Sequence, residues 1–256
     1  MEVAPWPRYS VQVKPNGALE VKYSSVVPSR IVLEAKRLRE MGFMEDRHFT
    51  VNSSRRGERY IYIRMGGLIR AARLSVHGSG EQQKLAAEFV ERILQRAWEA
   101  GGEVYEKTKK VIEEGKAWGS LTLKGFVKEV WKGKRKLAVK TFGCTVAVGG
   151  SRLLHIAVAA EVGGVEDVYV FSFGRFGKMI LGFARARVNA PGGREADAER
   201  FAALVKALTG KKPKVLRSSR GKITIMLSKT HLYRLARYVE LAEAVETWLA
   251  EAFSKR

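Results

Sequence analysis

A repeated passage restricts the fold of this chain more than any other feature of its sequence. Residues 57–74 read GERYIYIRMGGLIRAARL, and residues 221–238 read GKITIMLSKTHLYRLARY, so the two copies lie 164 residues apart. Both copies pass from an alternating, strand-like stretch into a stretch with helical spacing of apolar residues. Six matched positions are identical, and in the first copy they are Gly57, Ile61, Leu68, Arg70, Ala72 and Arg73. We therefore expect a fold that uses this strand-to-helix passage twice.

The segments around each copy also follow a common order of hairpin, helix, hairpin and helix. In the first half we predict a hairpin at 9–23, a helix at 28–41, strands near 48–52 and 59–64, and a helix at 68–76 after Gly66-Gly67 end the strand. The second half has a hairpin at 168–189, a helix at 194–209, strands near 214–218 and 222–227, and one helix from His231 to the end. This pattern predicts an internally duplicated α+β protein whose antiparallel sheets are backed by helices.

Three segments follow from this pattern. Residues 1–100 form a first half-repeat, residues 101–120 a helical connection, and residues 121–256 a second half-repeat with extra central strands. We expect a monomer in which the halves are related by a pseudo-two-fold axis, which suits a partner of similar symmetry such as duplex DNA.

Net charge points to a polyanionic partner. The chain carries 47 Lys and Arg against 26 Asp and Glu, a formal net charge of +21. Such an excess opposes folding by self-repulsion, and nucleic acid is its most frequent reason. A charged coat of the hyperthermophilic type is the other explanation, but ion-pair networks need both signs.

Basic residues gather in three stretches, 47–73, 107–140 and 206–239, and the last of these contains no acid. In RYIYIRM, Tyr60, Tyr62 and Arg64 share the face opposite Ile61 and Ile63. We therefore predict a basic sheet face, rich in Arg, Tyr, Asn and Thr, that contacts nucleic acid in both halves. A merely solvated outer face is the alternative. The predicted contact residues are Arg47, Asn52, Arg55, Arg56, Arg59, Tyr62, Arg64, Lys132, Lys134, Arg135, Arg185, Arg187, Lys214, Arg217, Arg220, Lys222 and Lys229.

Catalytic, metal and cofactor sites are not predicted. The four His residues lie far apart, Cys144 is the single cysteine, and no metal-binding spacing of His and Cys exists. HGSGEQQ lacks the third glycine of a dinucleotide loop, and GRFGK lacks the length of a P-loop. No apolar run reaches the about 20 residues of a membrane span. Without a secretion signal and with one cysteine, a cytoplasmic location is expected.

Long stretches resemble a known family. VKYSSVVPSR, RHFTVNSSRRGERYIYIR, EQQKLAAEFVERILQRAWEAGGEVYEKTKKVIEEGKAWGSLTLKGF and ARVNAPGGREADAERFAALVKALTGKKPKV resemble the multicopy Pyrobaculum repeat-protein family called PaRep type two b. The resemblance covers most of the chain. It implies a hyperthermophilic archaeal source, and it implies almost nothing about function.

The order of elements is also similar to that of LAGLIDADG homing endonucleases and their non-cleaving relatives. Each half of those proteins is a helix, hairpin, helix, hairpin, helix unit, and the resemblance implies a saddle whose sheets lie on DNA. The motif helix of that family is not recognisable here; its nearest approach is FVERILQRAWEAGGE, which ends at Glu103. The metal-binding acids of the family are therefore not assigned.

The sequence thus leads to three hypotheses about function. The first is a non-catalytic nucleic-acid-binding protein that prefers duplex DNA, with RNA as the other polymer, and needs no cofactor. The second is a metal-dependent phosphodiesterase of the homing-endonuclease type. The third is a basic adaptor that binds acidic protein or membrane partners.

Overall fold

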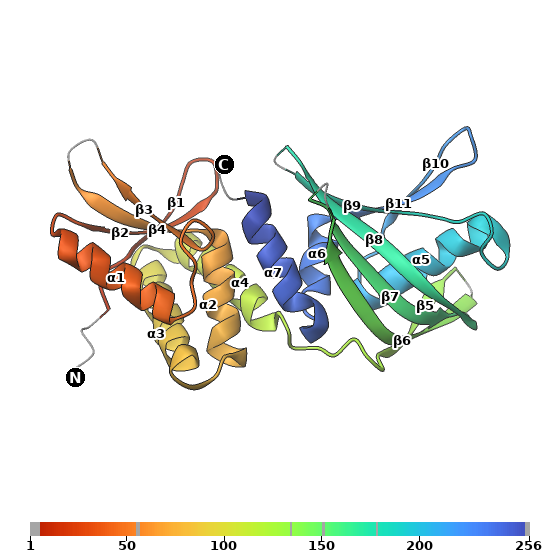
Figure 1. The fold of residues 1–256 in the computed structure, drawn as a ribbon, viewed down its shortest axis with the longest axis horizontal. Helices are drawn as coiled ribbons and strands as arrows, with labels where there is room; N and C mark the ends of the chain where they lie inside the picture. Colours follow the sequence, from red (N-terminus) through yellow and green to blue (C-terminus); the bar gives the residue numbers. More distant parts are fainter. Residues whose placement is uncertain (1–5, 55–56, 134, 150–151, 178, 254–256) are drawn as a thin grey trace. The chain divides into compact units, whose positions relative to one another are not determined.

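The chain folds into two compact units. The computed structural model describes residues 6–54, 57–133, 135–149, 152–177 and 179–253. Unit 1 comprises Met1–Ala117 and Leu249–Arg256, and unit 2 comprises Trp118–Trp248. Each unit combines helices with an antiparallel sheet, as Figure 1 shows, so the predicted α+β class is confirmed.

Unit 1 pairs a four-stranded sheet with helices, as far as the structure describes it. Its strands, in the spatial order β1-β2-β4-β3, are β1 (Ser10–Val13), β2 (Leu19–Ser25), β3 (Phe49–Ser53) and β4 (Arg59–Ile63). Its helices are α1 (Pro28–Glu40), α2 (Met65–His77), α3 (Gly80–Glu99) and α4 (Gly102–Ala117). Helix α1 contacts β2 and β4, and helices α3 and α4 contact β1.

The core of unit 1 forms where the apolar side of the sheet meets these helices. Phe49, Ile61 and Ile63 are almost fully buried, whereas the intervening Tyr60 and Tyr62 keep part of their surface exposed. This alternation confirms the predicted strand parity and follows from the two-residue period of a β-strand. One side of the sheet therefore packs on helices, and the other side stays open.

Close packing of α4 on α2 depends on a glycine. A Cβ at Gly115 would lie 2.8 Å from the carbonyl oxygen of Ile69 and 2.7 Å from the Cβ of Ala72. Any larger side chain would push the two helices apart. The segment predicted as a helical connection is thus a packed helix of unit 1.

Unit 2 contains a larger sheet, seven-stranded within the described residues, in the order β10-β11-β9-β8-β7-β6-β5. Its strands are β5 (Val127–Lys132), β6 (Arg135–Val148), β7 (Leu154–Val162), β8 (Val165–Phe176), β9 (Met179–Arg185), β10 (Lys214–Arg217) and β11 (Ile223–Ser228). Its helices are α5 (Gly193–Thr209), α6 (Lys229–Leu235) and α7 (Val239–Phe253), the last residues of which are counted with unit 1.

Helix α5 is buried around most of its circumference. It contacts β5, β6 and β7 toward one edge of the sheet and β11 toward the other. A single helix is only about 10–12 Å wide, so the sheet must curve around it, and Figure 1 shows α5 against the curved strands. This burial explains why apolar residues are not confined to one stripe of α5.

Unit 1 and the α5 region of unit 2 share a strand arrangement. The order β1-β2-β4-β3 of unit 1 corresponds to β8-β9-β11-β10 of unit 2. Val51 pairs with Ile61 as Val215 pairs with Ile225, which keeps the offset of 164 residues. Helices α2 and α6 also start at matched positions. These matches fit the predicted repeat; a duplication as such, and a two-fold axis between its halves, stay predictions.

The predicted continuous C-terminal helix is wrong. Helix α6 ends at Leu235 and α7 begins at Val239. Between them the backbone accepts hydrogen bonds from the segment after α4: Gly119 donates to Ala236 (3.0 Å) and Leu121 donates to Arg237 (2.8 Å). A tertiary contact therefore replaces the helical hydrogen bonds at this point.

Candidate nucleic-acid interface

The open side of the unit 1 sheet carries a patch of polar and aromatic side chains, called here the tyrosine face. Tyr62 lies between Lys22 and Thr50 on the neighbouring strands, and Tyr60 lies between Ser24 and Asn52. Strand β1 adds Ser10 and Gln12 at the edge. All of these side chains are exposed or half-buried, so each tyrosine is the large member of a row of small or flexible polar groups. The tyrosine face consists of Ser10, Gln12, Glu20, Lys22, Ser24, Thr50, Asn52, Tyr60 and Tyr62.

Two lysines approach the tyrosine rings. The ammonium of Lys22 lies 4.3 Å from the centroid of the Tyr60 ring, and that of Lys14 lies 5.8 Å from the centroid of the Tyr62 ring. Both distances fall within the range of cation–π attraction. The acid of the face, Glu20, forms an ion pair with Lys14 and accepts a hydrogen bond from Gln12 (2.7 Å). The face therefore presents cations directly beside aromatic rings.

Several predicted contact residues belong to or border this face. Tyr62 and Asn52 are members, and the Asn52 amide donates to the Thr50 hydroxyl (2.9 Å). Arg59 is exposed at the start of β4, and Arg64 is half-buried where β4 leads into α2. Arg55 and Arg56 lie outside the described residues.

Sequence reasoning omitted the two lysines of this region because it concentrated on the arginine-rich stretch 47–73. The signal was present in the predicted hairpin at 9–23. The alternation in LEVKYSS places Lys22 on the polar side of its strand, beside the side chains of RYIYIRM once those strands pair. Pairing between β2 and β4 is a tertiary fact that alternation alone does not reveal.

Strand alternation places His48 on the outward side with Thr50 and Asn52, but His48 is buried, with 1% of its surface exposed. Its Nδ1 accepts a hydrogen bond from the Met44 backbone N–H (2.9 Å). Burial, helped by the charge of Arg70, lowers the pKa of His48 to about 3. His48 is therefore a structural residue of the core.

In unit 2 the corresponding side of the sheet mixes apolar with polar residues, so it differs from the predicted face rich in Arg, Tyr, Asn and Thr. Val168 and Val170 of β8 are 50% and 45% exposed, and the outward residues Leu181, Phe183 and Met226 are half-buried. Pairing places Phe183 opposite Met226 on one side and Ser172 on the other. Arg185 is exposed on β9, opposite Thr224. Periodicity shows which residues point outward, but several of the outward residues of unit 2 are hydrophobic.

Three of the predicted arginines are held by acids within the protein. The guanidinium of Arg187 contacts Asp167 (2.5 and 3.0 Å) and the fully buried Asp197 (2.9 Å). Arg217 forms two hydrogen bonds to Glu195 (3.0 and 2.7 Å). Arg47 forms an ion pair with Glu251 (2.7 Å).

The Arg187 cluster has the character of a structural contact. Hydrogen bonds from Arg187 lower the pKa of Asp167, and the Arg187 backbone N–H also donates to Asp197 (2.7 Å). A guanidinium bound on two sides cannot also make a bidentate contact to a base. We leave Arg187 out of the interface.

The remaining predicted cations of unit 2 lie mainly at turns and strand ends. Lys229 lies 4.8 Å from the ring centroid of Tyr233, and Lys134 lies outside the described residues. Lys132 ends β5, where its backbone alone is described. The cations that are exposed at the surface are Arg135, Lys214, Arg220, Lys222 and Lys229.

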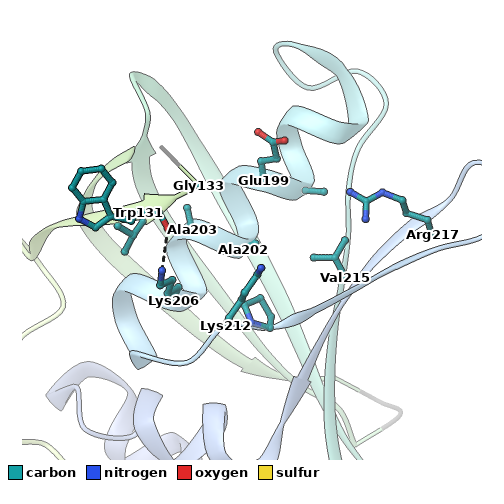
Figure 2. A pocket seen from close by; sticks show the side chains of 12 residues that line it. Trp131, Gly133, Glu199, Ala202, Ala203, Lys206, Lys212, Val215 and Arg217 are labelled. Carbon is teal, nitrogen blue, oxygen red and sulfur yellow. Dashed lines mark hydrogen bonds between the residues drawn. The ribbon is translucent and has the colours of Figure 1, made fainter. Parts of the chain in front are cut away.

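A pocket of about 660 Å³ lies beside α5, between the end of β5 and the start of β10. Figure 2 shows alanine side chains of α5 at its floor and cations at its rim. Lys206 donates to the carbonyl oxygen of Trp131 (3.0 Å), and Arg217 is bound to Glu195. Two of its cations therefore have partners within the protein, as Lys14 has beside the tyrosine face.

Groups suited to catalysis do not converge in the residues described. No set of three or more His, Cys, Asp or Glu among them is placed to hold a metal ion. Burial raises the pKa of Cys144 to about 11, so its thiol stays protonated near neutral pH. None of the described helices is both long and apolar enough to cross a membrane.

Comparison with known proteins identifies the family of this chain. A family model described as PaRep2b protein matches residues 14–253. No curated protein and no solved structure matches the chain. The predicted family is thus confirmed, and the likeness to LAGLIDADG proteins stays a prediction.

Proposed function

We propose that this chain, which belongs to the PaRep2b family, is a nucleic-acid-binding protein that uses the tyrosine face of unit 1. The observation that carries the proposal is the pairing of Tyr60 and Tyr62 with Lys22 and Lys14 on an open sheet surface. Aromatic rings beside cations match the two parts of a nucleotide, because bases stack on rings and phosphates attract ammonium groups.

The charge of the whole chain supports this choice of partner. A formal net charge of +21 raises the local concentration of any polyanion around the protein. Arg59, exposed at the start of β4, adds a contact that depends on charge rather than on sequence. The protein is expected to act as a monomer in the cytoplasm and to bind without cutting.

Salt-dependent binding tests this proposal. Labelled duplex DNA, single-stranded DNA and RNA are titrated with the protein at several salt concentrations, followed by fluorescence anisotropy. We expect log K to fall linearly with log[salt], with a slope of about −0.7 to −0.9 per phosphate neutralised. Duplex DNA is the polymer that the sequence favours. Absence of binding to every polynucleotide at low salt would reject the proposal.

A charge-matched control separates this surface from general basicity. Lys22→Gln removes a cation from the tyrosine face and Lys14→Gln removes one that borders it. Lys36→Gln removes a cation from α1, where Lys36 is exposed. Weaker binding is expected for the first two variants and unchanged binding for the third. Equal losses in all three would mean that net charge alone, and no particular surface, attracts the polymer.

Cleavage is examined with the same samples. Supercoiled and linear DNA are incubated with Mg²⁺ or Mn²⁺, because hydrolysis of a phosphodiester usually needs divalent ions held by carboxylates. We expect both substrates to stay intact. Nicking that persists through purification and disappears when one acid is mutated would establish the phosphodiesterase hypothesis instead.

A further inference from the structure

The arrangement of the two tyrosines indicates which form of nucleic acid unit 1 takes. Tyr60 and Tyr62 occupy alternate positions of β4, an internal strand of the sheet, so their side chains point to the same side. Alternate residues of a strand are about 6.8 Å apart, since each residue advances about 3.4 Å. The two rings are thus neighbouring platforms on one line.

This spacing does not suit a duplex. Bases within one strand of duplex DNA follow each other every 3.4 Å or so and cover each other's faces. A ring that meets a duplex from outside can reach only backbone or base edges. In a single strand the bases can separate, and neighbouring bases about 7 Å apart would match the two tyrosines.

The cross-strand neighbours of the tyrosines are small or flexible polar residues, and both tyrosines keep part of their surface exposed. Directly across from them stand Ser24, Asn52, Lys22 and Thr50. A sheet that used tyrosines only for its own stability would be expected to pair them with aromatic or β-branched side chains, which stabilise cross-strand contacts most. Of these four neighbours only Thr50 is β-branched, and its hydroxyl accepts a hydrogen bond from Asn52. The two half-buried rings are therefore bordered mainly by polar side chains on the neighbouring strands.

The lysines are placed for the backbone of such a strand. Lys22 and Lys14 each lie near one ring, at 4.3 and 5.8 Å from the centroids. Both side chains are long and flexible, and a phosphate is a stronger partner for an ammonium than a ring is. When bases stack on the tyrosines, the Lys22 ammonium can turn to the adjoining phosphate, and the Lys14 ammonium can do so by exchanging its partner Glu20 for a phosphate. Asn52 and Thr50 supply donors and acceptors for base edges at the β3 side.

We infer that the tyrosine face binds unpaired nucleic acid, with two successive bases stacked on Tyr60 and Tyr62 and their phosphates contacted by Lys22 and Lys14. This inference rests on the proposed function and narrows it from nucleic acid in general to a single strand. It departs from the duplex preference that charge and pseudo-symmetry predict from sequence.

The test uses full-length protein and labelled oligo(dT) and oligo(rU) of about 20 nucleotides, longer than a single-strand site of about 4–16 nucleotides. A duplex of equal length is the comparison ligand. Tyr60→Val and Tyr62→Val remove the rings and keep residues that favour strands, so the sheet is preserved. Tyr60→Phe and Tyr62→Phe keep the rings. Trp98→Val is the matched control, because Trp98 is an aromatic of α3 with 71% of its surface exposed.

Each valine variant is expected to lower single-strand affinity by about 5- to 150-fold, the effect of losing one base stack. The phenylalanine variants and Trp98→Val are expected to bind as the unchanged protein does. Duplex affinity should stay the same in every variant. Thermal unfolding of each variant verifies that the fold is intact.

Three results would overturn the inference in distinguishable ways. If duplex and single strand bind equally well and the valine variants lower neither affinity, the stacking role is wrong while the proposed function stands. If the unchanged protein binds no polynucleotide, both fail. Loss of single-strand binding in the phenylalanine variants as well would show that the hydroxyl groups, and not the rings, make the contact.

Discussion

Strands β4 and β11 occupy matched places in their units and differ mainly on one side. Inward, Ile61 and Ile225 are both fully buried, and Ile63 matches Leu227. Outward, Tyr60 and Tyr62 of β4 stand where β11 has Thr224 and Met226. Residues on the inner side must be apolar because the sheet buries them against helices. Residues on the outer side are constrained only by the solvent or partner that this side contacts. The two units therefore share an arrangement of strands and present different surfaces.

The two outer surfaces therefore favour different kinds of partner. The outer side of unit 1 combines lysines and tyrosines, and that of unit 2 exposes Val168 and Val170 beside half-buried Phe183. An apolar surface gains free energy from leaving water and a basic one from meeting anions. We expect nucleic acid to distinguish the two sheets even though their strand order is the same.

The largest expected effect tests the equivalence of the inner sides. Ile61→Ala and Ile225→Ala each remove a fully buried side chain and should lower the free energy of unfolding by about 2–5 kcal/mol. Urea denaturation followed by circular dichroism measures the loss, with a separate transition for each unit if they unfold independently. A large loss at one position and none at the other would break the structural correspondence of the two strands.

A pair of arginines provides the next test. Arg70 donates to the carbonyl oxygen of Gly42 (2.7 Å) and Arg234 donates to that of Thr209 (2.7 Å), in both cases at the end of the helix that precedes the hairpin. Arg70→Ala and Arg234→Ala should each cost about 1.5–3 kcal/mol, the contribution of a charged hydrogen bond. Thermal unfolding of both variants checks it. Stability equal to that of the unchanged protein in either variant would mean that the matched contact is incidental.

Buried histidines make the stability of the protein sensitive to acid. The pKa of His48 in unit 1 is about 3, against an ordinary value of 6.5, because of burial and nearby arginines. Below about pH 6.5 the unfolded chain therefore binds a proton at His48 that the folded unit excludes. The free energy of unfolding is unaffected by His48 above about pH 6.5 and decreases as the pH falls toward about 3. At about pH 5 the loss should be roughly 2 kcal/mol.

Measurement of unfolding free energy against pH checks this expectation. His48→Asn removes the titration and keeps an acceptor for the Met44 N–H. Its stability should depend less on pH between about 6.5 and 5. A dependence identical to that of the unchanged protein would assign the acid sensitivity to other groups, such as His231 in unit 2, whose pKa burial also lowers.

The smallest expected effect concerns the outer sides. Lys22→Ala should reduce the slope of log K against log[salt] by about 0.7 for a single strand, the value for one phosphate contact. Thr224→Ala, on the matched strand of unit 2, should leave that slope unchanged. Equal slopes for both variants would remove Lys22 from the interface and weaken the distinction between the two surfaces.

Local pattern was sufficient for much of the fold. Alternation in RYIYIRM and KITIML predicts which residues face the core, and Asn16-Gly17 predicts the first hairpin. The start of helix α2 at Met65 was not predicted from the sequence. Gly66 and Gly67 were expected to precede the helix, yet both belong to its first turn, where a Cβ at Gly67 would lie 2.4 Å from the carbonyl oxygen of His48. A close approach between distant segments, rather than turn formation, requires that glycine.

The candidate site was predictable only in part, because some of its members come together only through strand pairing. Tyr62 and Asn52 follow from strand parity, whereas Lys22 and Lys14 become neighbours of the tyrosines only when β2 pairs with β4. In the sequence, Arg187 cannot be told apart from an arginine that is free to bind a ligand. Only the structure shows that its carboxylate partners come from β8 and α5. Charge partners of this kind depend on which elements pack together.

By itself the sequence determined the α+β class, the repeated strand-to-helix passage and the buried side of each strand, because these follow from periods of 2 and 3.6 residues read over short distances. Tertiary structure alone decided the curvature of the unit 2 sheet around α5, the break between α6 and α7, and the meeting of lysines with tyrosines. Each of these depends on hydrogen bonds or contacts between residues far apart in the chain, whose partners no local pattern specifies.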